Sequence, residues 1–508
     1  MNLLSSTTIF SFITLLSRIL GYLRDILIAI FLGATMYADA FFVAFRLPNT
    51  FRRLFAEGTF NSAFIPSFTK ENSLSKTRGI NFANEVFTLI SLALLFLVLL
   101  AEIFTPFLVY LIAPGFFQNI DKFDLAVDLT RITFPFLFLV SLSSFFSGIL
   151  NSYNRFAAAA AAPIILNIVL ITSLLISFYK DLNFTTNLAI GVTFSGILQL
   201  IFLMYFTKRY YSPKFTIKYK IEKKVKFFLK KLIPSIFSSG ITQINILVGT
   251  IIASFQSGAV SYLYYADRVY QINLAIAGIA VSTVSLPILS KAIKSKNSKK
   301  IMNIQNKSIE LSLLLSIPAC FGLIISSEQI ISSLFGYGSF SIEDVKITAD
   351  ALVYFSLGIP AFALLKIFAN IYFARDNTKT PFFISFVVVT INIIISLYYF
   401  KDFGFLIIPL ATSISSWVGT IIYFYLLNTS KFVQFKFDIF KNIFKIILST
   451  IAMSLLLIYS LNLFDDKLNY TFHLKFLYLI IVIIIAAAFY LFLCYLFKIL
   501  NLKYYRTS

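Results

Sequence analysis

The sequence predicts an all-α polytopic membrane protein with fourteen transmembrane helices. Three observations predict this class: 59% of the 508 residues are hydrophobic, only 13% are charged, and long apolar runs recur along the whole chain. A soluble domain carries charges on about a quarter of its residues. A membrane β-barrel would show short alternating segments rather than continuous apolar runs.

Each expected span is an apolar run of about twenty residues, the length that crosses a bilayer. With the N-terminus inside and the sides alternating, the inside loops hold 29 Lys and Arg residues and the outside loops hold 6. Because cytoplasmic loops are enriched in these residues, both termini are expected in the cytoplasm. The same rule explains the net charge of +21 without a nucleic-acid partner. The expected centres lie near Ile19, Leu54, Leu95, Leu139, Ile168, Leu198, Ile244, Ala277, Leu315, Ser356, Val389, Ser413, Met453 and Ile484.

The loop between the sixth and seventh spans, residues 208–231, holds ten of the inside cations. It is partly amphipathic, so one interpretation places it along the cytoplasmic face of the membrane, beside anionic lipids. A solvated basic linker is an equally good interpretation. In both cases the loop connects two halves of the first twelve spans.

Weak internal repeats indicate that these halves are related. The triplet Tyr37–Asp39 recurs as Tyr265–Asp267, Pro66–Lys70 resembles Pro287–Lys291, and all the matches are separated by 218 to 228 residues. This spacing predicts two pseudo-symmetric six-helix lobes around a central cavity, with chance similarity among apolar segments as the alternative. The expected domains are an N-lobe at 1–207, the basic linker at 208–231, a C-lobe at 232–430 and two appended C-terminal helices at 431–508.

The first two spans, residues 17–70, contain an unusual number of ionisable side chains. Each costs roughly 2.5–3.5 kcal/mol at bilayer depth on insertion scales, so together they should line a wet cavity or pair with one another. Pro48 is expected to bend the second span and free a backbone carbonyl. The eight side chains are Arg18, Arg24, Asp25, Asp39, Arg46, Arg52, Arg53 and Glu57.

Five of these residues are cationic and three are anionic. The surplus of arginine suits an anion, and the planar guanidinium matches phosphate oxygens. The second lobe adds Asp267 and Arg268, so the sequence predicts an electropositive cavity for a phosphate-bearing substrate. The alternative is an ion-pair network that only joins two helices, with Arg46 and Arg53 at the membrane interface. Lys366, in a later span, could be a cavity charge or could extend to the interface.

Enzymatic chemistry is not expected. The chain has no Gly-Lys dipeptide and hence no phosphate-binding loop of the Walker type. Cys320 and Cys494 are far apart in apolar runs, and His473 is the single histidine, so neither a disulfide nor a metal site is expected.

Several stretches resemble the MurJ (MviN) family of bacterial lipid II flippases, in the multidrug/oligosaccharidyl-lipid/polysaccharide exporter superfamily. They are SRILGYLRD and GATMYADAFFVAFRLPNTFRRLFAEGTFNSAFIP near the N-terminus, then LIAPGF, ITFPFLFLVSL, ILNSYNRFA, YYADRVYQI, SLPILSK, LFGYGSF and TKTP. The resemblance covers nearly the whole chain. It implies fourteen helices, with two lobes around a V-shaped cavity and two C-terminal helices that form a groove for a lipid tail.

The resemblance also implies a function: alternating access that moves lipid II, an undecaprenyl-diphosphate disaccharide-pentapeptide, from the cytoplasmic to the periplasmic leaflet of the inner membrane. Export of another lipid-linked oligosaccharide or a drug is the alternative. Lipid II, membrane lipids and cell-wall synthesis proteins are the expected partners of a monomer without cofactor or metal. Coupling to membrane potential or to a monovalent cation stays open.

The family's cavity residues carry over to this chain by position. Arg18, Arg24, Arg52 and Arg268 match cavity arginines, and Asn49 joins them as a substrate-binding candidate. Asp25, Asp39, Glu57 and Asp267 are expected cavity acids, with Asp39 also a candidate for a periplasmic gate. Further candidates are Ser17, Arg53 and Lys366.

The chain departs from the family pattern in two places. After Arg268 the family often has an acid and a proline, where this chain has Gln271–Ala275. This puts in doubt an acidic role at Gln271 and a bend at Asn273. The eleventh span, residues 381–400, contains no acid, so a cation site built there on an aspartate is not expected.

Overall fold

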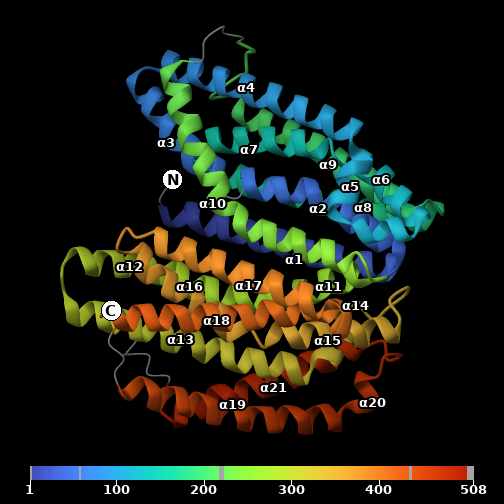
Figure 1. The fold of residues 1–508 in the computed structure, drawn as a ribbon, viewed down its shortest axis with the longest axis vertical. Helices are drawn as coiled ribbons and strands as arrows, with labels where there is room; N and C mark the ends of the chain where they lie inside the picture. The colour runs from blue at the N-terminus through green and yellow to red at the C-terminus, as the bar shows by residue number, and fades with distance from the viewer. Residues whose placement is uncertain (1–2, 57–58, 217–221, 434–436, 500–508) are drawn as a thin grey trace. The chain divides into compact units, whose positions relative to one another are not determined.

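A computed structural model describes residues 3–56, 59–216, 222–433 and 437–499. These residues form α-helices joined by short turns, with no strand among them (Figure 1), so the all-α prediction is confirmed. The chain divides into two compact units, Met1–Ser261 and Tyr262–Ser508. Each unit is described by itself.

The first unit contains ten α-helices and a short 3₁₀ turn within the described residues. In chain order they are α1 (Leu3–Leu32), α2 (Met36–Ala56), α3 (Thr59–Leu74), α4 (Lys76–Ile103), α5 (Thr105–Ile112), η1 (Pro114–Gln118), α6 (Ile120–Thr133), α7 (Phe136–Ser152), α8 (Phe156–Lys180), α9 (Phe184–Thr207) and α10 (Lys223–Ala253). The next helix, α11 (Ala259–Leu274), begins at the end of this unit.

The second unit continues α11 through a π-helical segment, η2. The elements that follow are η2 (Ala275–Ala280), α12 (Val281–Lys294), α13 (Ser298–Ile325), α14 (Ser327–Phe335), α15 (Ile342–Ser356), α16 (Ile359–Phe373), α17 (Lys379–Phe403), η3 (Gly404–Leu406), α18 (Ile407–Thr429), α19 (Phe437–Leu463), α20 (Asp465–Leu468) and α21 (Lys475–Leu496).

The order of helices repeats between the two units. The series α4 to α9 corresponds to the series α13 to α18, and the first residues of matching helices are 222 or 223 positions apart. Both series begin with a 28-residue helix followed by a helix of eight or nine residues. This offset lies within the range of spacings seen in the sequence. Helices α19 to α21 follow the second series without a counterpart.

The described residues contain ten segments that are long and apolar enough to cross a membrane, by length and composition. Four of these segments each hold two α-helices: Ile120–Ser152, Ala259–Lys294, Ile342–Phe373 and Lys379–Thr429. All fourteen expected centres fall within helical segments of the structure. The chain is therefore a multi-pass membrane protein, and the count of fourteen spans stays a prediction.

Phenylalanine builds the core of the first unit. Phe60, Phe64 and Phe68 follow one another at four-residue spacing on α3, so they share one face of the helix and all are buried. The ring of Phe64 lies 5.0 Å from that of Phe60 and 5.2 Å from that of Phe145 on α7. Phe228 on α10 meets Phe64 edge-on at 6.2 Å. These contacts hold α3, α7 and α10 together.

The connection after α9 is tied to α4. The Tyr211 hydroxyl donates to Asn84 Oδ1 at 2.8 Å, and the Thr216 backbone amide donates to the Thr88 hydroxyl at 2.9 Å. Burial raises the pKa of Tyr211 above its ordinary value, so the hydroxyl keeps the proton that it donates. This ordered, non-helical run is the first part of the expected basic linker; residues 217–221 lie outside the described part, and Lys223 begins α10.

Helices α19 and α21 pack side by side, and α19 also packs on α13 (Figure 1). Lys475, at the start of α21, is fully buried, and its ammonium donates at 2.8 Å to the carbonyls of Gly336 and Tyr470. The ammonium also lies 4.2 Å from the ring centre of Tyr337, a cation–π contact. These contacts attach the C-terminal helices to the loop between α14 and α15.

The contact between η1 and the end of α10 predicts a stability difference between two glycine substitutions. The Gly115 amide donates to the Ser254 hydroxyl at 3.0 Å, and a Cβ at position 115 would lie 2.4 Å from backbone atoms of Ser254 and Phe255. We expect Gly115→Ala to cost about 1–3 kcal/mol through overpacking. Thermal unfolding of the detergent-purified protein would measure this.

The matched control is Gly322→Ala. Gly322 lies inside α13 with nothing within 4 Å of an added Cβ. Because alanine favours a helix over glycine by about 1 kcal/mol, this variant should unfold no earlier than the wild type. Equal losses of stability in both variants would contradict the close packing inferred at Gly115.

Candidate functional site

The first charged group of the predicted site is a buried cluster on α1. Arg24 donates from Nη2 to Asp25 Oδ1 at 2.7 Å and from Nη1 to Asn167 Oδ1, on α8, at 3.0 Å. Arg24 and Asp25 are only 6% and 2% exposed. A buried charge pair is costly unless further hydrogen bonds complete it, and Asn167 supplies one. The cluster therefore holds the guanidinium in a fixed orientation.

Asn167 also holds the preceding turns of α1. Its amide donates to the Ser17 carbonyl at 2.9 Å, so Ser17 takes part through its backbone. Arg18 and Asp25 share a face of α1 at seven-residue spacing. In the structure, however, Asp25 forms its ion pair with the adjacent Arg24, whose long side chain bends to meet the carboxylate. The Arg18 side chain is exposed.

The second group surrounds Asp39, whose side chain is fully buried in the first turn of α2. Its Oδ2 accepts from the Lys122 ammonium at 2.6 Å and from the Gly258 amide at 2.9 Å. Its Oδ1 accepts from the amide of Ser261 at 2.9 Å and from its hydroxyl at 2.6 Å. Four donors satisfy the carboxylate and link α2 to α6 and to the start of α11.

Sequence reasoning placed Lys122 in an outside loop and missed this pairing. Lys122 is 5% exposed, lies on α6, and its ammonium sits 4.1 Å from the ring centre of Phe116. The LIAPGF motif thus provides one wall of the Asp39 site through Phe116. The sequence did contain a signal, because Lys122 is the only cation in the predicted loop between the third and fourth spans. Its partner Asp39 lies 83 positions away, so spacing along the chain did not indicate the pair.

The effect of Pro48 on α2 is visible in the hydrogen bonds. Pro48 lies inside the helix and has no amide hydrogen, so the Ala44 carbonyl lacks its usual partner four residues on. The Thr133 hydroxyl, at the end of α6, donates to this carbonyl at 2.9 Å. The freed carbonyl expected from the sequence is confirmed, and a neighbouring helix satisfies it.

Two further arginines on α2 bond neutral oxygens. Arg46 donates to the Thr250 hydroxyl on α10 at 2.7 Å, and Arg52 donates to Asn49 Oδ1, one turn earlier, at 2.9 Å. Asn49, a predicted substrate ligand, thus orients Arg52. The Arg53 side chain and Glu57 lie outside the described part of the chain.

The second unit carries Asp267 and Arg268 on α11. Arg268 donates to the Tyr264 hydroxyl at 2.8 Å and stacks over that ring at 4.7 Å. Gln271 donates its amide to Asp267. At the position where the family often has an acid, this chain therefore has a donor that satisfies Asp267.

The two YAD triplets hold different places in their helices. Helices α2 and α11 begin 223 positions apart, whereas Asp39 and Asp267 are 228 apart, so Asp39 is in the first turn and Asp267 in the third. Their equivalence in the repeat, inferred from the triplets, is therefore wrong by five positions. The chain stays helical through Asn273 and then widens into η2.

Lys366 lies on α16 with its side chain exposed. Among the described residues no group of three or more His, Cys, Asp or Glu side chains could hold a metal ion. The acids Asp25 and Asp39 pair with Arg24 and Lys122, so neither needs Arg18, Arg46 or Arg52 for charge balance. The arrangement provides oriented guanidinium groups, which suit an anionic ligand.

The chain has the helical fold of MATE-like membrane transporters. The structure resembles an inward-facing multidrug resistance MATE family transporter of the MOP superfamily, with a TM-score of 0.65 over 83% of this chain and 97% of that chain. The sequences are 13% identical, so this likeness concerns the fold alone.

The particular family follows from four further matches. A family model described as lipid II flippase MurJ matches residues 28–492. A probable lipid II flippase MurJ of Rickettsia prowazekii is 40% identical over 82% of each chain, and one of Buchnera aphidicola (subsp. Baizongia pistaciae) is 32% identical over 97% of this chain and 96% of its own. A solved lipid II flippase MurJ, in an inward closed conformation, is 30% identical, with a TM-score of 0.82 over 96% of this chain and 98% of its own.

The chain belongs to the MurJ family, whose members are transporters rather than enzymes. This confirms the resemblance seen in the sequence.

The Asp39 cluster predicts a large effect of one isosteric substitution. Asp39→Asn would leave the buried Lys122 ammonium without its carboxylate, which should cost about 3–5 kcal/mol. Replacing both partners, as Asp39→Asn with Lys122→Met, removes the uncompensated charge and should recover part of that loss. Thermal unfolding in detergent would measure the coupling.

Substitutions of two serines near Asp39 provide a second test and its control. Ser261→Ala removes one of four hydrogen bonds to Asp39 and should cost about 1–3 kcal/mol, whereas Ser257→Ala changes an exposed serine in the turn before α11 and should be neutral. Strictly additive effects of the Asp39 and Lys122 substitutions would show that the pair is not coupled.

Proposed function

We propose that the chain flips lipid II from the cytoplasmic to the periplasmic leaflet of a bacterial inner membrane. The observation that carries the proposal is the buried Arg24 cluster on α1, in a member of a lipid II flippase family. Hydrogen bonds to both Asp25 and Asn167 orient the Arg24 guanidinium. Pre-orientation lowers the entropy lost when a ligand binds.

The lipid diphosphate is the group that these arginines would hold. Guanidinium and phosphate form paired charge-assisted hydrogen bonds, stronger than those between neutral groups. In this proposal Arg18, Arg24, Arg52 and Arg268 bind the diphosphate, and Asn49 keeps Arg52 in position. Asp25 orients Arg24, while Asp267, Arg53, Glu57 and Lys366 remain candidates from sequence.

Alternating access requires contacts that can break, and Asp39 is our candidate for the periplasmic gate. Its bonds to Gly258 and Ser261 tie the start of α2 to the start of α11. Both connections belong to outside loops if the termini are cytoplasmic, as the charge distribution predicts. The energy source would be membrane potential or a monovalent cation, in a monomer that works beside cell-wall synthesis proteins.

Complementation tests the function. The wild-type chain should restore growth of cells depleted of their own lipid II flippase, and Arg24→Ala, Arg52→Ala and Arg268→Ala should not. A lost charge-assisted hydrogen bond is worth about 1.5–3 kcal/mol, so each variant should bind lipid II about 10- to 100-fold more weakly. Immunoblots of membrane fractions would establish equal insertion.

Arg78→Ala is the matched control. The Arg78 side chain is exposed, and its 3.6 Å ion pair with the mostly buried Glu71 is too long for a good hydrogen bond, so this variant should complement fully. Complementation by all three cavity variants would contradict the binding assignment. Export of another lipid-linked oligosaccharide, the alternative, would appear as tighter binding of that lipid than of lipid II.

A further inference from the structure

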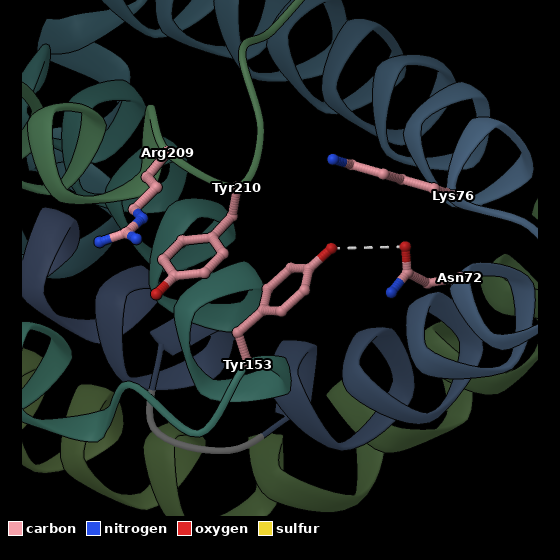
Figure 2. A pocket seen from close by; sticks show the side chains of 5 residues that line it. All are labelled: Asn72, Lys76, Tyr153, Arg209 and Tyr210. Atoms are coloured by element: carbon pink, nitrogen blue, oxygen red, sulfur yellow. Dashed lines mark hydrogen bonds between the residues drawn. The ribbon is translucent and has the colours of Figure 1, made fainter.

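A polar pocket of about 250 Å³ lies in the first unit, away from the Arg24 and Asp39 clusters. It is lined by residues from three connections that are distant in sequence (Figure 2): Asn72 and Lys76 at the α3–α4 turn, Tyr153 after α7, and Arg209 and Tyr210 after α9. All three connections are predicted to lie on the cytoplasmic side by the alternation of the spans and the excess of Lys and Arg in the inside loops taken together.

Two stacked tyrosines form the wall of this pocket. The rings of Tyr153 and Tyr210 are 4.7 Å apart and nearly parallel, and Phe68 of the aromatic core meets Tyr153 edge-on at 6.1 Å. The Tyr153 hydroxyl reaches Asn72 Oδ1 at 3.4 Å. Asn72 is itself held by close packing, since a Cβ at Gly79 would lie 2.8 Å from it. The wall is therefore built on rigid elements.

The polar groups of the pocket favour an anion. Figure 2 shows the Lys76 ammonium on the side of the Tyr153 hydroxyl, with Arg209 on the other side of the Tyr210 ring and the Tyr210 hydroxyl directed away from Lys76. Arg155 donates to the Tyr210 hydroxyl at 2.9 Å, so the Tyr210 proton is directed to another acceptor. No acid lines the pocket, and the neighbouring Glu71 pairs with Arg78.

We infer that this pocket binds the phosphate of an anionic phospholipid headgroup in the cytoplasmic leaflet. Lys76 and Arg209 line the pocket and present charged donors that a phosphate accepts. The volume is below that of typical small-molecule pockets, about 300–1,000 Å³, and suits a headgroup. Basic pockets between helices on the cytoplasmic side bind such lipids, and tyrosine is enriched at the membrane interface.

Lipid titration tests the inference and is independent of flipping. The purified full-length chain would be titrated with phosphatidylglycerol in neutral detergent, and bound lipid counted by native mass spectrometry. Lys76→Gln and Arg209→Gln should each weaken the first binding step about fivefold, the value expected for one basic residue near an anionic surface. Tyr210→Phe, which keeps the ring and removes the hydroxyl, should weaken it by a smaller factor.

Lys214→Gln is the matched control. Lys214 lies in the same connection as Arg209 and is exposed, and its hydrogen bonds to Asn84 and from the Thr216 hydroxyl are made by backbone atoms. This variant loses the same charge and should bind as the wild type does. Unchanged binding by the Lys76→Gln/Arg209→Gln double variant, or an equal loss in Lys214→Gln, would overturn the inference.

Soluble competitors distinguish the two sources of phosphate. Inorganic phosphate and glycerol 3-phosphate at about 10 mM should leave the phosphatidylglycerol peaks unchanged if the site takes a lipid, because the headgroup binds together with its anchored chains. Displacement by these anions in the wild type, absent in the double variant, would overturn the lipid assignment in favour of a soluble phosphate.

Discussion

The buried carboxylate of Asp39 is the interaction on which the first unit most depends. A charge removed from water costs several kcal/mol unless it is fully paired, and Asp39 is 0% exposed. Its four donors come from α6 and from the turn and first residues around α11, so these segments are held to α2 at one point. If any of these segments moved away from α2, the Asp39 carboxylate would become exposed to solvent or would lose hydrogen-bond donors.

The same requirement explains other contacts between helices of this unit. A backbone or side-chain polar group inside an apolar environment must find a partner within the protein. The Ala44 carbonyl freed by Pro48 accepts from Thr133, and Arg24 uses Asn167 as well as Asp25. Each of these bonds satisfies a polar group and at the same time joins two helices. Polar residues therefore fix helix positions that apolar packing alone would define less well.

Much of the fold could be predicted from sequence because its causes are local. Apolar runs predict helices, and all the expected centres fall within helical segments. The repeat was visible as spacing, although the helices show an offset of 222 or 223, and the YAD triplets do not occupy equivalent turns. The charged residues of the first two spans could be singled out from sequence, because ionisable side chains in apolar runs are rare. Lys122 and Asn167 were missed, since each lies on another helix far along the chain.

The sequence by itself determined the class of protein, the helices, and the presence of a charged stretch in the first two spans. Hydropathy and segment length depend only on neighbouring residues, so they were sufficient to predict the class of protein and its helices. Only the tertiary structure decided which charges meet: Asp25 with Arg24, Asp39 with Lys122, and Asp267 with the amide of Gln271. Pairing depends on the reach of each side chain and on how the helices pack, and spacing along the chain specifies neither. In the case of Asp39 the partner lies 83 positions away.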